Sequence, residues 1–274
     1  MRPLHPKGLI LTDLDGTMLG AREYFDGVGE ALEALEMLGF TVVPVTAKSI
    51  WEIVHLWLKL LGRPPAAAVA ESGGAIYAVR GLLAEPSGVL EDLGLEYVEL
   101  GPRLEEAESL ILEALSGCRG YLRLSRAGPR EASIITGLPP GRAALAARRL
   151  YLEVIWHPRG ECLDRAASRA WDLGLYVHRS RRLLHLGVHR GKGRAVSKLL
   201  AEPAFSNPTL IVAAGDSEAD EGFMGVADVR VVIPSDSPSR PKLADYMPVP
   251  YPAPEGWVEA MKLVVLKAPL ALRG

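Results

Sequence analysis

Glutamine is absent from the 274-residue chain, asparagine occurs once, at Asn207, and cysteine occurs twice, at Cys118 and Cys162. Two cysteines without a CxxC spacing cannot form a zinc cluster by themselves, so we expect two buried thiols in a reducing cytoplasm. The scarcity of heat-labile amides, together with 21 prolines, is typical of a thermophile, and a GC-rich genome produces part of the same bias.

Charge of one sign and long hydrophobic runs are also missing. The formal net charge of −2 provides no overall attraction to nucleic acid or to an anionic membrane. The apolar stretch 263–272 is interrupted by Lys267 and Pro269 and is too short to span a bilayer. Pro3, Pro6 and charged side chains near the start predict no secretory leader. We therefore expect a cytoplasmic protein whose partners include neither nucleic acid nor a membrane.

The first and last thirds of the chain alternate apolar strands with helices. Helices of this length between strands imply right-handed crossovers and a parallel sheet. We therefore predict an α/β fold whose parallel-sheet core is formed by residues 1–84 and 188–274. Its strands are expected at 9–13, 40–46, 66–70, 209–214 and 229–233, and its helices at 28–38, 50–61, 193–201, 219–224 and 254–266.

Residues 85–187 show a different pattern, in which strand-like and helix-like segments do not alternate regularly. Mixed signals of this kind indicate an α+β domain inserted into the parallel domain. Strands are expected at 121–125, 132–136, 152–156 and 183–186, and helices at 104–115 and 142–151.

An apolar strand beginning at Leu9 ends in two carboxylates, Asp13 and Asp15. Residues two apart in a strand point the same way, so both carboxylates project from its end. Two like charges this close are tolerated mainly when a cation or a proton lies between them. Gly16 permits a tight turn, and Thr17 adds a hydroxyl that can hold it. The alternative is a solvated Asp-Gly turn after a core strand.

Two further clusters lie where a strand or loop leads into a helix. Thr46 follows the second strand, and its hydroxyl with the adjacent N–H groups can hold a phosphate oxygen, although such a threonine is more often a helix cap. Lys192 lies at the start of a helix, where its charge opposes the helix dipole, between two glycines that let the backbone approach a ligand. The alternative for Lys192 is a solvated lysine in a glycine turn.

A fourth cluster, Asp216 and Asp220, follows another apolar strand. These carboxylates can share a hard cation with Asp13, and Mg²⁺ favours a site of few carboxylates, several waters and phosphate oxygens. The alternative is a helix start in which Ser217 is the N-cap. The ordered occurrence of all four clusters at strand ends and helix starts favours a phosphate and metal site over four independent structural explanations.

The order DxDGT, Thr, Lys and GDSxxD resembles the haloacid dehalogenase superfamily of aspartate-nucleophile phosphatases. The resemblance covers the whole chain and implies a Rossmann-like core, with the insert as a cap between the second and third motifs. It implies that Asp13 is the nucleophile and that Asp15 is the general acid and base. It also implies that Thr46 and Lys192 orient the phosphate oxygens. The implied Mg²⁺ ligands are Asp13, Asp15 through its carbonyl, Asp216 and, directly or through water, Asp220.

Within this superfamily, the chain is similar to the mannosyl-3-phosphoglycerate phosphatases. The similar segments are Thr46-Ala47-Lys48, the turn at 71–76 and the segment 120–131, with departures at Ala47, Ser72 and Ala132. The similarity implies a small phosphorylated sugar and glycerate substrate, dephosphorylated to mannosylglycerate. The alternatives are another sugar-phosphate or phosphoglycolate phosphatase, a phosphomutase, and a non-catalytic protein that binds a phosphorylated ligand.

Substrate recognition is expected in the cap, which closes over the site and excludes water. Arg126 and Arg130 can clamp a carboxylate through their guanidinium groups, and Glu131 can accept hydrogen bonds from sugar hydroxyls. Further candidates are Lys48 and His189 for substrate binding and Glu71 for the mouth of the site. The alternative for the arginines is a solvated or ion-paired surface position. The sequence predicts no oligomeric state.

Overall fold

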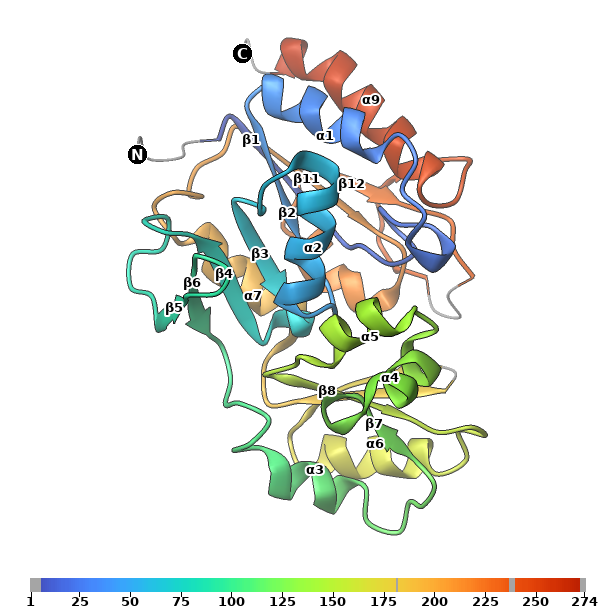
Figure 1. Cartoon of the computed structure of the whole chain (residues 1–274). Coiled ribbons are helices and arrows are strands. Elements are labelled where there is room, and N and C mark those ends of the chain that lie inside the picture. The colour runs from blue at the N-terminus through green and yellow to red at the C-terminus, as the bar shows by residue number, and fades with distance from the viewer. Residues whose placement is uncertain (1–5, 181, 237–239, 272–274) are drawn as a thin grey trace.

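A parallel sheet of five strands forms the centre of the core, in the order β13-β12-β11-β1-β2. The computed structural model describes residues 6–180, 182–236 and 240–271 (Figure 1). Every residue of β1 and β2 is buried, as expected for parallel strands that helices cover on both faces. The strands are β1 (Gly8–Thr12), β2 (Phe40–Pro44), β11 (Leu210–Gly215), β12 (Val229–Val232) and β13 (Met247–Pro248).

The side chains of β1 alternate between the two faces of this sheet. Ile10 packs in an apolar cluster with residues of α1 (Val28–Met37), α2 (Ile50–Leu61) and α9 (Glu255–Ala271). Leu9 and Leu11 pack on the opposite face with α7 (Gly191–Leu200) and α8 (Glu221–Met224). Figure 1 shows α1 and α9 side by side on the first face. The α/β core predicted from the alternating pattern is confirmed.

An antiparallel sheet continues from β2 at the edge of the core. Its order is β3-β4-β6-β5, and an isolated bridge between Val45 and Val69 links its first strand to the parallel sheet. The strands are β3 (Ala67–Ala70), β4 (Ala75–Val79), β5 (Gly88–Leu90) and β6 (Leu95–Glu99), with the 3-10 helix η2 (Glu71–Gly73) between β3 and β4.

The position of β5 and β6 bears on where the inserted domain begins. Both strands come from the segment 85–187, yet they pair with β4 of the core. The two linkers between core and insert run side by side farther along, because a Cβ on Gly101 would lie 2.0 Å from the carbonyl oxygen of Val188. We therefore propose that the core extends through β6 and that the cap begins near Gly101.

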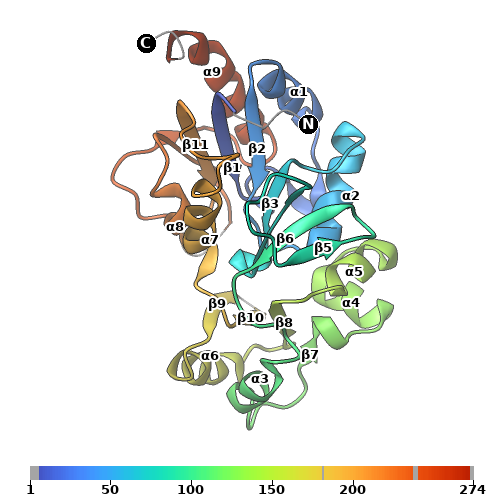
Figure 2. The same ribbon diagram turned by 90° about the vertical axis from the view of Figure 1, so that its left-hand side faces the viewer.

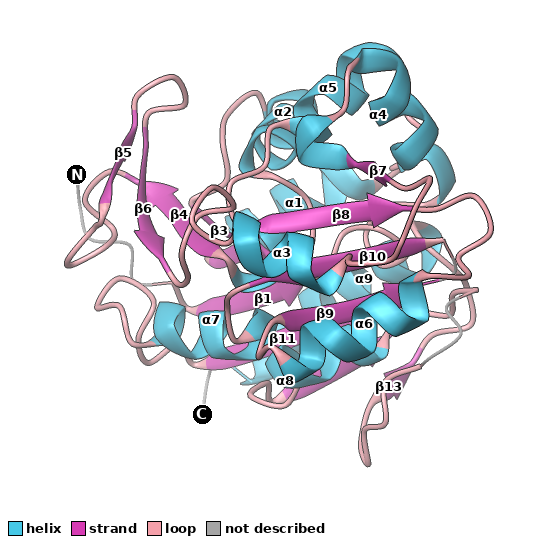
Figure 3. Ribbon diagram, turned by 90° about the horizontal axis from the view of Figure 1, so that it is seen from below, coloured by secondary structure: helices cyan, strands magenta, loops and turns pink. Residues whose placement is uncertain are grey.

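The cap is built on a third sheet, of order β7-β8-β10-β9, that is antiparallel throughout. Val154 packs with residues of α4 (Pro129–Thr136) and α5 (Pro140–Ala147) on one face of this sheet, and Ile155 packs with residues of α3 (Glu108–Ala114) and α6 (Leu163–Asp172) on the other. Figure 3 shows α3 and α6 in front of this sheet. Figures 1 and 2 show the cap below the core, with α5 nearest to α2. The strands are β7 (Leu122–Arg123), β8 (Leu152–Trp156), β9 (Tyr176–Ser180) and β10 (Leu183–Gly187).

One predicted strand of the cap is wrong. Residues 132–136 lie in α4, not in a strand. Gly128 is the N-cap of this helix, Pro129 occupies its first turn, and the Glu131 carboxylate accepts a hydrogen bond from the Gly128 N–H at 3.1 Å. Gly137 ends the helix with φ of 70°. These signals at the helix ends outweigh the strand preference of the Ile-Ile-Thr run.

The prediction that both cysteines are free thiols is wrong. Cys118 and Cys162 form a disulfide with a Cα–Cα distance of 5.3 Å. The pairing follows from the packing of α3 against α6, because Cys118 lies just after the first helix and Cys162 just before the second.

No helix of the described ranges is long and apolar enough to cross a membrane.

Candidate active site

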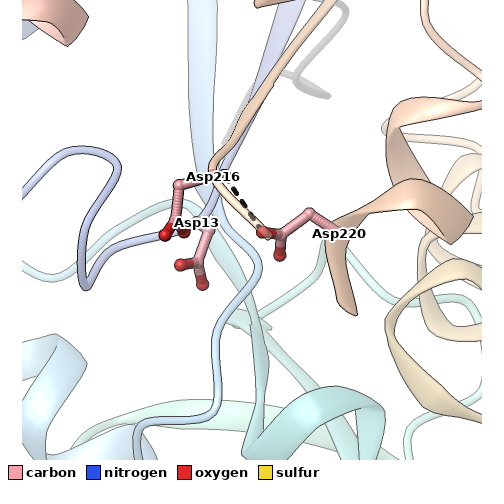
Figure 4. Close-up of side chains that lie close together, drawn as sticks. All are labelled: Asp13, Asp216 and Asp220. Atoms are coloured by element: carbon pink, nitrogen blue, oxygen red, sulfur yellow. Dashed lines mark hydrogen bonds between the residues drawn. The ribbon is translucent and has the colours of Figure 1, made fainter. Parts of the chain in front are cut away.

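The carboxyl edge of the parallel sheet gathers the predicted acids. Thr12 of β1 is in register with Ala214 of β11, so the residues that follow the two strands emerge next to each other. Asp13, Asp216 and Asp220 each offer a carboxylate oxygen, and these oxygens all lie within 4.8 Å of one another (Figure 4). The acids predicted to share a cation are therefore brought together.

Gly16 allows the turn after β1 to pass close to Asp216. Its φ is +81°, and a Cβ at this position would lie 2.8 Å from Oδ2 of Asp216. The next residue, Thr17, donates a hydrogen bond from Oγ1 to Oδ1 of Asp216 at 3.2 Å. The turn thus holds one carboxylate of the cluster in place.

Lys192 supplies the positive charge of the cluster. It lies in the first turn of α7, and its Nζ donates to Oδ1 of Asp13 and to Oδ1 of Asp220, at 2.7 Å in both cases. Burial raises the pKa of Asp13 to about 8, with Asp220 and Asp216 adding to the rise and Lys192 opposing it. Burial alone would lower the pKa of Lys192, but attraction to Asp13 and Asp220 raises it above its usual value. The ammonium therefore stays charged.

Asp220 uses both of its carboxylate oxygens in the protein. Oδ1 accepts from Lys192, and Oδ2 accepts from the N–H groups of Asp216 and Ser217 at 3.2 and 3.0 Å. The Ser217 hydroxyl also donates to Oδ2, at 3.0 Å. Asp220 thus orients Lys192 and the 216–217 backbone, which leaves the other acids to offer oxygens to a ligand.

Thr46 lies at the same edge of the sheet, one strand along. Val45 N–H donates to the Thr12 carbonyl at 2.8 Å, which sets the end of β2 beside the end of β1. Thr46 is buried, and its Oγ1 accepts a hydrogen bond from the Lys48 N–H at 3.3 Å. The hydroxyl is therefore fixed in direction, as an oxygen-binding role requires.

Asp15 and Lys48 belong to a second charged group, which faces the cap. The Lys48 ammonium lies 3.0 Å from Oδ2 of Asp15, 3.0 Å from Oε1 of Glu23 and 3.6 Å from Oε1 of Glu52. Neither glutamate was predicted from the sequence to belong to the site. Glu52 had a readable signal, because Ser49 and Glu52 have the capping-box spacing at the start of α2. Glu23 had none.

A cavity of about 900 Å³ separates this charged group from the cap. Asp15, Glu23, Lys48 and Glu52 line it on the core side. The cap side is mainly aliphatic, and its polar side chains are those of Thr136, Arg149 and His185. Burial lowers the pKa of His185 well below its usual value, so this imidazole is neutral. The apolar cap residues are Leu124, Ile135, Leu138, Ala146, Val154 and Leu183.

The predicted cap residues do not line this cavity. Arg126 is exposed and its guanidinium lies 3.6 Å from Glu108, while Arg130 is also exposed. Glu131 caps α4 as described above. Substrate contact by these three residues therefore stays a prediction that the arrangement of the cap does not favour.

His189 and Glu71 lie at the joint between core and cap. His189 stacks on Tyr176 with 4.6 Å between ring centroids, and its Nδ1 accepts from Gly191 N–H at 3.2 Å, so it supports the start of α7. The buried Glu71 carboxylate accepts from three successive N–H groups of the cap, at 150–152, over 2.8 to 3.1 Å. Both residues position elements of the site.

The chain resembles solved structures of one fold class. A haloacid dehalogenase-like hydrolase from Bacteroides thetaiotaomicron matches with a TM-score of 0.67 and 17% identity, over 94% of this chain and 99% of that chain. The sucrose-phosphatase from Synechocystis sp. PCC6803 matches with a TM-score of 0.61 and 14% identity, over 94% and 98%. No family model matches the chain. The fold is that of a haloacid dehalogenase-type hydrolase.

Curated relatives narrow this class. The chain is 46% identical over 265 residues, 94% of each protein, to the mannosyl-3-phosphoglycerate phosphatase of Aeropyrum pernix. It is 26% identical over 266 residues to the glucosyl-3-phosphoglycerate/mannosyl-3-phosphoglycerate phosphatase of Persephonella marina, covering 92% of this chain and 95% of that protein. The chain belongs to the mannosyl-3-phosphoglycerate phosphatase family, and it is a phosphoric monoester hydrolase.

Proposed function

We propose that this phosphatase hydrolyses mannosyl-3-phosphoglycerate to mannosylglycerate and inorganic phosphate. The observation that supports this substrate is the 46% identity, along 94% of the chain, to the mannosyl-3-phosphoglycerate phosphatase of Aeropyrum pernix. The acid and lysine cluster beside a cavity of about 900 Å³ supports the reaction, because such a cavity can enclose a small ligand while the cluster receives its phosphate.

Asp13 is the proposed nucleophile. Lys192 holds its Oδ1, which leaves Oδ2 to attack phosphorus. The new bond joins Asp13 to phosphorus as the bond to the leaving glycerate oxygen breaks, and the product is an aspartyl-phosphate. Attack of water on that phosphorus then releases inorganic phosphate and restores the carboxylate.

Asp15 is the proposed acid and base. Its side chain is 61% exposed, toward the cavity where the leaving group has to lie. In the first step it gives a proton to the leaving oxygen, and in the second it takes one from the attacking water. Thr46 and Lys192 then orient and neutralise the phosphate oxygens as charge develops on them.

The cluster also fits Mg²⁺. Carboxylate oxygens are the donors that this ion prefers, and Asp13 and Asp216 each offer a carboxylate oxygen within 4.8 Å of the other. We propose that these two, with the Asp15 carbonyl, hold the ion and that Asp220 acts through water. When bound, Mg²⁺ adds positive charge that offsets the negative charge of the phosphate.

Phosphate release tests the proposal. Mannosyl-3-phosphoglycerate, phosphoglycolate and common sugar phosphates are each assayed with Mg²⁺ and with EDTA. The proteins compared are the natural enzyme, Asp13→Asn and Asp172→Asn. Asp172→Asn is the control, because Asp172 is an exposed carboxylate at the end of α6. We expect the mannosyl compound to be preferred, with turnover lost in EDTA and in Asp13→Asn only. Equal or faster turnover of phosphoglycolate would contradict the proposed substrate and would leave the proposed mechanism unaffected. Full turnover by Asp13→Asn would overturn the mechanism.

A further inference from the structure

The proposed substrate carries two anionic groups, a phosphate and a carboxylate, and the site described so far accounts for the first. A buried or half-buried cation in the cavity is the natural partner for the second. Among the described residues that line the cavity, the side chains with a permanent positive charge are those of Lys48 and Arg149.

Lys48 is already neutralised by the protein. Three carboxylates, those of Asp15, Glu23 and Glu52, lie within 3.6 Å of its ammonium. A further anion at this lysine would meet three like charges, so Lys48 is a poor site for a substrate carboxylate.

Arg149 is held in a different way. Its guanidinium donates to main-chain carbonyls, from Nε to Leu152 at 2.7 Å, from Nη1 to Ala146 at 3.4 Å and from Nη2 to Ala47. In the described part of the chain it forms no salt bridge. Its charge attracts the nearby Glu71 carboxylate, whose oxygens accept main-chain N–H hydrogen bonds instead. The guanidinium is therefore oriented, carries more N–H donors than these carbonyls use, and has no carboxylate bonded to it.

The position of Arg149 suits a carboxylate close to a phosphate. Ala47, whose carbonyl it contacts, directly follows Thr46, the proposed phosphate-binding residue. In a 3-phosphoglycerate unit, one carbon separates the carboxylate carbon from the carbon that bears the phosphate ester. A substrate whose phosphate lies at Thr46 thus brings its carboxylate to the neighbouring part of the same loop.

We propose that Arg149 binds the carboxylate of the glycerate unit and so selects substrates that carry an acid next to the phosphate ester. This inference rests on the proposed function and assigns the role expected for Arg126 and Arg130 to a residue at the core–cap joint. Guanidinium and carboxylate groups match in shape as well as charge, so the selection depends on arginine in particular.

The test compares kcat/KM for mannosyl-3-phosphoglycerate with kcat/KM for p-nitrophenyl phosphate, which has no carboxylate. Arg149→Met is expected to lower the ratio of the two by roughly 10- to 150-fold, the range of a hydrogen bond to a charged group. Arg149→Lys keeps the positive charge but loses the planar guanidinium group that matches a carboxylate, so it is expected to give an intermediate ratio. Arg148→Met is the matched control, because Arg148 also joins cap to core, through Asp92 at 2.9 Å and Trp51, but does not line the cavity. Its ratio is expected to stay within about twofold of the natural enzyme.

Equal losses on both substrates in Arg149→Met would assign Arg149 a structural role and overturn the inference. If Arg149→Met does not fold, the natural enzyme is treated with phenylglyoxal and modification of Arg149 is mapped by mass spectrometry. Protection by 3-phosphoglycerate but not by glycerol 3-phosphate is expected, and equal protection by both would overturn the inference. Failure of the proposed function gives a different signature, in which the natural enzyme hydrolyses p-nitrophenyl phosphate but not mannosyl-3-phosphoglycerate.

Discussion

The Lys192 ammonium lies 2.7 Å from an oxygen of Asp13 and 2.7 Å from an oxygen of Asp220, and all three side chains are buried. One cation thus joins the acid that follows β1 to the acid near the start of α8. Without it, like charges would face one another at the carboxyl edge of the sheet. The lysine holds the site together as well as serving its chemistry.

Replacement of Lys192 by methionine is expected to lower the free energy of unfolding by about 3 to 5 kcal/mol, because it leaves buried carboxylates without their partner. Lys198→Met is the control on the same helix, since Lys198 is exposed and lies 3.5 Å from Glu202. Its loss is expected to stay below about 1 kcal/mol. Urea unfolding of both variants measures the difference, and similar losses would show that the buried ion pairs add no special stability.

Removal of metal is expected to abolish phosphate release, with recovery on addition of Mg²⁺. Asp216→Asn replaces a proposed ligand, so the Mg²⁺ concentration for half-maximal rate is expected to rise at least about tenfold. Glu218→Gln in the same loop is the control, because the Glu218 carboxylate is exposed and lies 3.8 Å from Lys242. A Mg²⁺ titration of the rate gives both values. An unchanged titration in Asp216→Asn would remove this residue from the metal site.

The stability of the fold is expected to fall as the pH drops below 6.5, in part because of His189. Burial lowers the pKa of this imidazole from 6.5 to about 4, so the folded protein keeps it neutral where the unfolded chain takes up a proton. The stabilisation is complete above pH 6.5 and is lost progressively toward pH 4. Between pH 7 and pH 5, the free energy of unfolding is expected to fall by about 2 kcal/mol more in the natural enzyme than in His189→Asn. Urea unfolding at the two pH values checks this, and an identical loss in both proteins would contradict it.

The disulfide is expected to stabilise the cap. Cys118 and Cys162 are 44 residues apart, and closing a loop of this length in the unfolded chain is worth about 4 kcal/mol. Addition of a reductant is expected to lower the melting temperature of the natural enzyme but not that of the double variant with alanine at both positions. Thiol titration in denaturant gives an independent measurement. Two reactive thiols before any reductant is added would contradict the pairing.

Much of the core and its acid cluster was predictable because both depend on short-range patterns. The strand expected at 9–13 is a continuous apolar run and lies at Gly8–Thr12, and the helix expected at 50–61 has regular apolar spacing and lies at Ile50–Leu61. Parallel strands end at one edge, so residues that follow β1 and β11 had to meet. Proximity of Asp13, Asp216 and Asp220 is therefore a consequence of topology that the sequence already contains.

The cap was less predictable because its contacts depend on packing between distant segments. The disulfide and the Glu23–Lys48 pair join residues with no local pattern to connect them. Arg149 bonds to main-chain carbonyls, which every residue type carries, so the sequence does not reveal its partners. Arg126 was predicted from the sequence as a substrate-binding residue, yet it lies at the surface. Residue type alone cannot tell these two arginines apart.

The Glu71 carboxylate accepts hydrogen bonds from the main-chain N–H groups of residues 150–152 in the cap. A joint of this kind is indifferent to which side chains the cap presents there. Substitution of Leu150 or Leu152 by a residue other than proline therefore leaves the N–H donors to Glu71 in place. This part of the core–cap joint is thus preserved when the cap side chains at 150–152 change.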